Sequence, residues 1–260
     1  MMKGKRNRAE ERSKEQGLHR TRLECRILGA VSLILASVLA FQNIRPVSEN
    51  SVQVAAYSAA EAYESSQTMN QDSDFLILVN KDHPLPEDYE VNLHWLNSGR
   101  CAVADEIYGA LKDMLEDGTV NGRQFVVASG FRDRERQEEL LEEDIQTAME
   151  RDGLTRQEAY DQETRETMPP GYSEHETGLA VDIVSLDYQV LDEGQETTAE
   201  NQWLRENCSK YGFILRYPKG KGDITGIDYE AWHFRYVGVD AAEEIMRRGI
   251  TLEEYLEEKK

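Results

Sequence analysis

The chain has 260 residues, and its 39% of hydrophobic residues supplies enough apolar material for a folded core, which excludes a wholly disordered protein. Its formal net charge of −20 argues against a nucleic-acid-binding protein, because phosphate recognition requires a basic face. The charge is unevenly distributed. Residues 1–26 contain nine Lys and Arg against four Asp and Glu, a balance of +5, and residues 27–260 carry the remaining −25.

An uncharged apolar run, residues 27–41, follows this basic leader. A buried core helix would show a polar face at helical spacing, and the run shows none. We therefore expect residues 27–44 to be a signal-anchor that leaves the leader 1–26 in the cytoplasm, or a signal peptide cleaved after Ala40. Either form exports the acidic remainder of the chain.

Beyond this segment, residues 45–73 are rich in Ser, Ala, Gln, Asn and Glu, which predicts a linker. Residues 74–260 then form a single predicted domain without internal repeats. Cys101 and Cys208 lie in this domain, where an exported environment permits a disulfide between them without requiring one.

Short β-branched and aromatic runs alternate with helical patterns throughout the domain. The runs predict strands at 75–79, 125–129, 179–184, 213–217 and 232–236. Apolar spacing predicts helices over 103–114 and 137–145, two more begin at capping boxes (Thr155, Thr251), and helices 198–211 and 239–248 end at Gly212 and Gly249. The fold class is therefore α+β, a small and mostly antiparallel sheet with flanking helices.

Two of the five histidines lie in segments that could build a metal site. His175 precedes a predicted turn at Gly178, and Asp182 lies in the strand that follows, so a chain reversal could bring the two together. His233 lies in the predicted strand 232–236. Two imidazoles and one carboxylate are three protein ligands, which leave a tetrahedral zinc one position for water, the pattern of catalytic zinc sites.

The strand around His233 also supplies a candidate base. Period two places His233 and Arg235 on one face, which we expect to face solvent, and the aromatic residues on the core face. Glu230, three residues before His233, could approach a water in the metal site and accept its proton. His83 and His94 are expected to be structural or surface residues.

These segments, with several others, resemble the VanY-type D-alanyl-D-alanine carboxypeptidases, zinc peptidases of the bacterial cell wall. The resemblance extends over nearly all of 74–260. Its blocks are ILVNKDHPLPEDY (77–89), SGFR with a following Gln137 (129–137), PPGYSEHETGLAVDI (169–183), KYGFILRYPKGKGDITGIDYE (210–230) and WHFRYVG (232–238). The resemblance implies His175, Asp182 and His233 as zinc ligands and Glu230 as the catalytic base.

The same resemblance, together with substrate chemistry, suggests three substrate-binding residues. A carboxypeptidase recognises a free terminal carboxylate, which a guanidinium can bind through two charge-assisted hydrogen bonds. Arg132 matches the family's arginine for this role, Ser173 matches a serine that binds the same end of the substrate, and Gln137 is expected to line the pocket. One position departs from the family: Ala231 stands where a proline is usual, which puts in doubt how rigidly Glu230 is held.

The sequence thus predicts a monomeric, membrane-tethered zinc carboxypeptidase at the extracytoplasmic face of a bacterial cell membrane. Its expected reaction is removal of the terminal D-alanine from peptidoglycan stem peptides. One alternative keeps the site and changes the bond: an L,D-carboxypeptidase acting on tetrapeptide stems. Another is a non-catalytic cell-wall-binding module of the same fold. A nucleic-acid partner is excluded by the charge.

Overall fold

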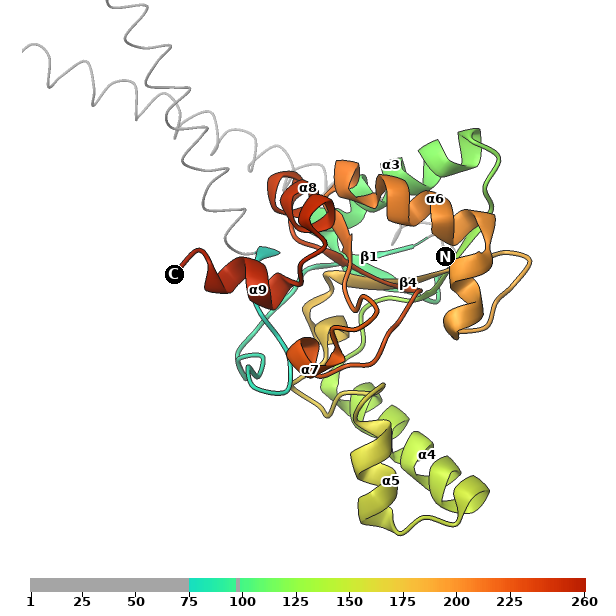
Figure 1. The fold of residues 1–260 in the computed structure, drawn as a ribbon, viewed down its shortest axis with the longest axis vertical. Coiled ribbons are helices and arrows are strands. Elements are labelled where there is room, and N and C mark those ends of the chain that lie inside the picture. The colour runs from blue at the N-terminus through green and yellow to red at the C-terminus, as the bar shows by residue number, and fades with distance from the viewer. Residues whose placement is uncertain (1–74, 97–98) are drawn as a thin grey trace, which may run out of the picture. The chain divides into compact units, whose positions relative to one another are not determined.

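The computed structural model describes residues 75–96 and 99–260, which belong to one compact unit (Figure 1). The predicted leader, membrane segment and linker, residues 1–73, lie outside the described residues. No helix in the described part of the chain is both long and apolar enough to cross a membrane.

The centre of the domain is a four-stranded sheet in the order β3-β4-β6-β5, in which all neighbours are antiparallel. A separate antiparallel pair is formed by β1 and β2. The strands are β1 (Leu93–Trp95), β2 (Ala102–Ala104), β3 (Phe125–Ser129), β4 (Ala180–Ser185), β5 (Phe213–Leu215) and β6 (His233–Tyr236). The predicted α+β class with a small antiparallel sheet is confirmed.

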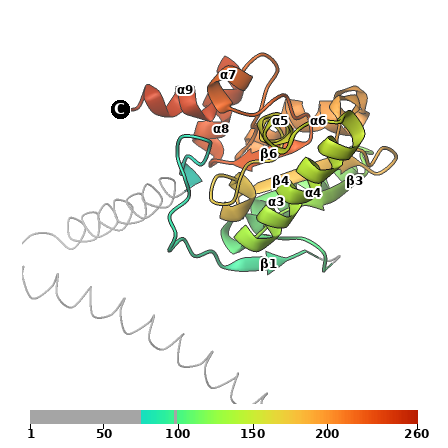
Figure 2. The same ribbon diagram turned by 90° about the horizontal axis from the view of Figure 1, so that it is seen from below.

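Helices cover the sheet and extend from it. In Figure 1, α3 (Asp105–Val120), α6 (Ala199–Asn207) and α8 (Val239–Arg248) lie on one side of the central strands. On the other side, α4 (Arg134–Asp152) and α5 (Arg156–Glu163) run side by side as a hairpin that extends away from the sheet in Figure 1; in Figure 2, seen from below, the two helices lie in front of the central strands. The remaining elements are α7 (Gly222–Thr225), α9 (Leu252–Glu257) and the 3₁₀ helices η1 (Glu174–Thr177), η2 (Glu193–Thr197) and η3 (Cys208–Tyr211).

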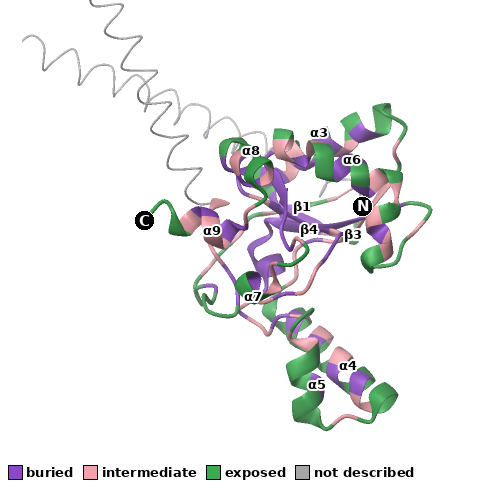
Figure 3. Cartoon of the chain, viewed as in Figure 1, coloured by how far each residue is buried: buried purple, intermediate pink, exposed green. Residues whose placement is uncertain are grey.

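Strand alternation decides which residues enter the main core. Val181, Ile183 and Phe234 are fully buried and pack with apolar residues of α3 and α6. Because successive side chains point to opposite faces of a strand, Asp182 and His233 face the other way, toward the side from which the α4–α5 hairpin extends. Figure 3 shows the contrast between the buried central strands and the largely exposed hairpin.

The helix ends follow the local signals in the sequence. Both predicted capping boxes form: Thr155 caps α5 and Thr251 caps α9, each with the reciprocal bond from the third helical residue. Gly212 and Gly249 take the left-handed conformation, with φ of 82° and 64°, and end η3 and α8.

The predicted strand at 75–79 is wrong. These residues lie outside the sheets, although their side chains do alternate between two core clusters, with Phe75 and Ile77 against one and Leu76 and Leu78 against the other. The carbonyl groups of Phe75 and Ile77 accept hydrogen bonds from the buried Arg235 at 2.9 and 2.8 Å. A side chain thus supplies the bonds that a neighbouring strand would have made.

Two smaller expectations also change. The helix predicted over 103–114 begins at Asp105, because residues 102–104 pair with β1. The disulfide that the composition permitted is absent, since Cys101 and Cys208 are both free among the described residues. Cys208 is fully buried in the main core, where burial raises the pKa of its thiol to about 12 and makes it a poor nucleophile.

Candidate metal and catalytic site

The register between β4 and β6 places Asp182 directly opposite His233, although 51 positions separate them in the sequence. Directly opposed residues of an antiparallel pair have Cβ atoms about 4.5–5.5 Å apart on the same face of the sheet. The strand pairing alone therefore brings these two side chains together. Asp182 is also paired with Ser129 of β3, just beyond an irregularity in the β3–β4 ladder.

His175 reaches the same point through the predicted chain reversal. It lies in η1, which ends at Gly178 in the left-handed conformation, with φ of 72°, before the chain enters β4. The Nδ1 atom of His175 lies 2.7 Å from the carbonyl oxygen of Gly130. That carbonyl accepts the Nδ1 proton, so Nε2 of His175 keeps its lone pair for a ligand.

Glycine is required at position 130 for this arrangement. A Cβ atom there would lie 2.3 Å from the carbonyl oxygen of Ala102 in β2, a separation that real Cβ atoms do not show. The Phe131 amide donates to the same Ala102 carbonyl at 2.6 Å. The backbone at Gly130 and Phe131, which orients His175, therefore lies too close to β2 for a side chain at position 130.

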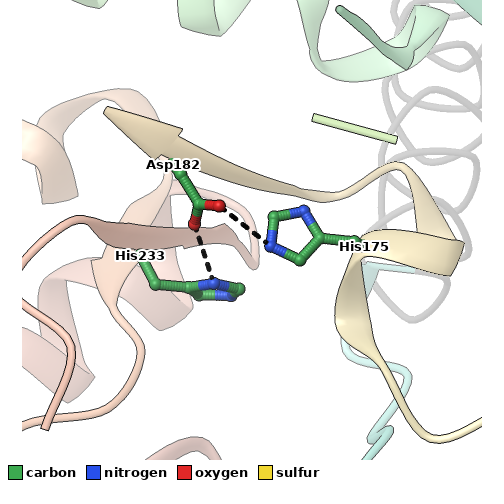
Figure 4. A group of neighbouring side chains, drawn as sticks. All are labelled: His175, Asp182 and His233. Atoms are coloured by element: carbon green, nitrogen blue, oxygen red, sulfur yellow. Dashed lines mark ion pairs between the residues drawn. The ribbon is translucent and has the colours of Figure 1, made fainter. Parts of the chain in front are cut away.

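The three side chains form one buried cluster (Figure 4). The carboxylate of Asp182 points between the two imidazoles: Oδ2 lies 3.3 Å from Nε2 of His175, and Oδ1 lies 3.2 Å from Nδ1 of His233. One ligand atom from each residue lies within 4.8 Å of the others. Each residue is at most 4% exposed.

The donor set of this cluster fits a zinc ion. Oδ1 of Asp182 is buried and has no hydrogen-bond partner among the described residues, although Nδ1 of His233 is near. Buried polar atoms normally have a partner, so atoms that converge without bonding one another indicate a shared cation. Two imidazole nitrogens and one carboxylate are ligands that zinc accepts.

The charges of the cluster favour a cation as well. Burial opposes ionisation of Asp182, but the neighbouring histidines hold the pKa of its carboxyl well below the ordinary value. Burial and the Arg132 guanidinium together lower the pKa of His175 to about 4, so this imidazole is neutral and able to act as a ligand.

Glu230 stands beside this cluster and is almost completely buried, with Oε2 3.5 Å from Nδ1 of His233. Burial, reinforced by the negative charge of Asp182, raises the pKa of Glu230 to about 8. A bound cation acts in the opposite direction, because positive charge favours the carboxylate. Burial and the charges around Glu230 therefore set the pKa of its carboxyl group, and a general base needs a pKa near the working pH.

The backbone around Ala231 is well held despite the absence of proline. The Glu230 amide donates to the Tyr217 carbonyl at 3.2 Å, and the Ile183 amide donates to the Trp232 carbonyl at 2.9 Å. Between them, the buried Asn201 donates to the Ala231 carbonyl at 2.5 Å. Hydrogen bonds to α6, to β4 and to the segment after β5 therefore restrict the segment that carries Glu230.

A cavity of about 530 Å³ opens in front of the cluster, and all three predicted substrate-binding residues line it. Arg132 follows β3; its guanidinium forms no ion pair with the described residues, and its Nε atom is buried without a hydrogen-bond partner. Ser173 is 5% exposed and its side chain makes no capping bond to η1. Gln137 of α4 donates to the Met168 carbonyl at 2.6 Å, which leaves its buried Oε1 as an unsatisfied acceptor.

The prediction that the face of His233 and Arg235 is exposed to solvent is wrong. Arg235 shares the face of His233, but it is fully buried and bonded to Glu174, Phe75 and Ile77. Trp232 precedes β6 and lines the cavity instead of the core. His233 and Arg235 on one face and Phe234 on the other are all buried, so neither face of this strand is exposed to water.

Sequence reasoning missed a second layer of residues behind the cluster: Glu174, Arg216 and Tyr217. The ring centroid of Tyr217 lies 4.8 Å from that of His233, and Glu174 and Arg216 are fully buried. The sequence did contain one sign of this layer: an arginine lies inside each of two otherwise apolar strand runs, FILRY and HFRY. A buried arginine needs an acidic partner, so a buried carboxylate such as Glu174 could have been expected.

Comparison with known proteins identifies the family. The family model described as VanY, D-alanyl-D-alanine carboxypeptidase, matches residues 100–239. The chain belongs to the VanY family. A D-alanyl-D-alanine carboxypeptidase of Enterococcus faecalis is 38% identical over 187 residues, which is 71% of this chain and 66% of the relative, so the chain spans slightly less than two thirds of that protein.

Solved structures of VanY proteins and of an LD-carboxypeptidase share the fold described above. A vancomycin-resistance D,D-pentapeptidase VanY mutant in complex with Zn(II) is 38% identical, with a TM-score of 0.64 over 70% of this chain and 99% of that chain. VanYB in complex with D-alanine-D-alanine is 39% identical, with a TM-score of 0.65 over 71% and 98%. The LdcB LD-carboxypeptidase is 37% identical, with a TM-score of 0.61 over 72% and 87%. The Zn(II) complex of that VanY mutant agrees with the donor set of the cluster in this chain.

Zinc should stabilise the folded protein measurably. Because a metal that binds only the native state stabilises it by about 2.7 kcal/mol at a hundredfold excess over its Kd, we expect zinc to raise the Tm of the chelator-stripped protein by roughly 5–10 °C. Asp182→Asn should abolish most of this rise, and Asp144→Asn, which changes a carboxylate elsewhere in the cavity, should retain it. Differential scanning calorimetry measures the effect, and an equal rise in Asp182→Asn contradicts the site.

Proposed function

We propose that this protein is a zinc-dependent carboxypeptidase that removes the C-terminal D-alanine from peptidoglycan stem peptides ending in D-Ala-D-Ala. The observation that carries the proposal is the guanidinium of Arg132, which lines the same cavity as the zinc cluster and forms no ion pair with the described residues. A partly buried cation without an ion-pair partner is costly, and a substrate carboxylate would neutralise it. Membership of the VanY family supports the same reaction.

Substrate binding follows from the residues around the cavity. Arg132 binds the terminal carboxylate of the peptide, and the Ser173 hydroxyl, free of a capping bond, donates a further hydrogen bond to that end. The unsatisfied Oε1 of Gln137 can accept an N–H from the substrate. A free carboxylate is required at this position, so the enzyme cleaves only the last peptide bond of the chain.

Catalysis then depends on the neighbouring cluster. Zinc would be held by Nε2 of His175, the carboxylate of Asp182 and Nδ1 of His233, and when bound it supplies a Lewis acid that polarises the scissile carbonyl and acidifies water. Glu230 accepts the proton of the attacking water as the oxygen adds to the carbonyl carbon. Glu230 then delivers that proton to the departing amide nitrogen, so that the C–N bond breaks and D-alanine leaves as an amine.

An L,D-carboxypeptidase acting on tetrapeptide stems is the second candidate, and it is favoured by the similarity to LdcB. The two activities need the same zinc, base and carboxylate-binding residues and differ in the walls around the penultimate residue. A non-catalytic module is the weaker alternative, because the candidate ligands, base and arginine are all present around one cavity.

Replacing Glu230 with Gln should remove the base and leave the metal. We expect kcat for D-alanine release from a muramyl pentapeptide to fall by about 10²–10⁴-fold, while bound zinc remains unchanged. Glu166→Gln, which alters another carboxyl group lining the cavity, serves as the control. Full activity in Glu230→Gln contradicts the mechanism.

The scissile bond can be identified by the mass of the products. Incubation with pentapeptide and tetrapeptide stems in separate reactions should convert the pentapeptide to tetrapeptide and leave the tetrapeptide intact. Conversion of the tetrapeptide to tripeptide, with the pentapeptide unchanged, would assign the protein to the L,D-carboxypeptidases.

We further propose that residues 27–44 hold the protein, as a monomer, at the extracytoplasmic face of the bacterial membrane. The support is the charge asymmetry, +5 before this apolar segment and strongly acidic after it. The full chain is expected in the carbonate-resistant membrane fraction with its leader intact. A soluble product that begins at Phe41 would instead indicate signal-peptide cleavage.

A further inference from the structure

Glu174 is a fully buried carboxylate directly beside the metal cluster. It precedes His175 in η1, yet its side chain lies against a different residue of the cluster: Oε2 is 3.5 Å from Nε2 of His233. Its other oxygen, Oε1, accepts hydrogen bonds from Nε of Arg216 at 2.7 Å and from Nη1 of Arg235 at 2.8 Å. These two charged hydrogen bonds offset the cost of burying an ionised carboxylate away from water.

The two arginines are themselves held from outside the site. Arg216, just beyond β5, forms a two-point ion pair with Glu253 of α9, at 2.9 and 2.6 Å. Arg235 of β6 donates to the backbone carbonyl groups of Phe75 and Ile77. Both guanidinium groups are fully buried, so neither can turn toward solvent. They hold Oε1 of Glu174 in place, and Oε2 is left facing His233.

Oε2 of Glu174 can accept a hydrogen bond and Nε2 of His233 can donate one, but at 3.5 Å the two atoms form no hydrogen bond in this structure. Oε2 of Glu174 and Nε2 of His233 are both buried and have no hydrogen-bond partner among the described residues. The other nitrogen of the ring, Nδ1, faces Asp182. A histidine that binds a metal usually donates its remaining N–H to a carboxylate or carbonyl group, which fixes the tautomer and the orientation of the ring.

We propose that Glu174 is a positioning residue for the zinc site: it accepts the Nε2 proton of His233 and thereby presents Nδ1 to the metal. The proposal rests on the zinc site assigned above. His175 already has such a partner in the Gly130 carbonyl, so the two histidines are oriented by different groups, one neutral and one anionic. The anionic partner makes His233 the more strongly electron-donating ligand of the two.

A purely structural role would predict different behaviour. If Glu174 served only to neutralise Arg216 and Arg235, its replacement would lower stability without changing the metal site of molecules that fold. Metal affinity and the spectrum of a bound metal therefore separate the two roles. Neither measurement requires a substrate, so the result is independent of whether the proposed peptidase reaction is correct.

The test compares Glu174→Gln with Glu176→Gln. Glu176 lies in the same 3₁₀ helix and is also buried, but its carboxylate accepts from the Gly171 amide and faces Arg134. Zinc affinity is measured on the chelator-stripped full chain by competition with a chromophoric chelator, and ligand geometry by the visible spectrum of the Co(II)-substituted protein.

We expect Glu174→Gln to weaken zinc binding by roughly 10–100-fold and to shift the cobalt spectrum. Glu176→Gln should leave both within about twofold of the unaltered protein. Glu174→Asp retains the charge that balances the arginines but is one methylene shorter, so it should fold and weaken zinc binding by a smaller factor. If Glu174→Gln does not fold, the aspartate variant carries the test. Unchanged affinity and spectrum in the Glu174 variants, or an equal loss in Glu176→Gln, would overturn the proposal.

Discussion

The pairing of β4 with β6 is the constraint on which the rest of the site depends. Asp182 and His233 are opposed in this ladder, and both face away from the helices α3 and α6. A slip of β6 by one residue would turn His233 into the apolar core beside Val181 and Ile183, and would move Phe234 to the polar face that carries the cluster. The burial of these apolar residues, each worth about 1.5–3 kcal/mol, therefore determines where the metal ligands lie.

The face that carries the ligands is as buried as the core, and its polar groups are matched to one another. Glu174 and Glu253 offset the charges of Arg216 and Arg235. Because these groups are buried, replacing one of them would leave its partner as an uncompensated charge and destabilise the fold. This requirement connects distant parts of the chain: the segment at 75–77, the residue after β5, β6 and α9 all contribute to the support of one histidine.

The cavity has two chemically distinct parts. The cluster of His175, Asp182 and His233 forms one part together with Glu230. Arg132, Ser173 and Gln137 form the other part, which is built from the residues after β3, the beginning of α4 and the approach to η1. Under the proposed function, Arg132 binds the terminal carboxylate at a distance from the cluster, and this separation restricts the substrate to a peptide end. The α4–α5 hairpin supplies Gln137 to the cavity while most of its surface remains exposed.

The sequence alone was enough to predict the strands that carry Asp182 and His233 and the helix caps at Thr155, Thr251, Gly212 and Gly249. It also predicted seven of the residues that line the cavity: Arg132, Gln137, Ser173, His175, Asp182, Glu230 and His233. Period-two alternation, capping spacing and left-handed glycines act within a few residues, and the blocks resembling VanY enzymes are contiguous, so both are readable in one chain. The irregular backbone of 75–79, the buried position of Arg235 and the contact of Glu174 with His233 became visible only in the folded structure. These features depend on hydrogen-bond partners that lie 42 to 160 positions away in the sequence. No local sequence pattern predicts which buried carboxylate or carbonyl group a buried arginine will contact.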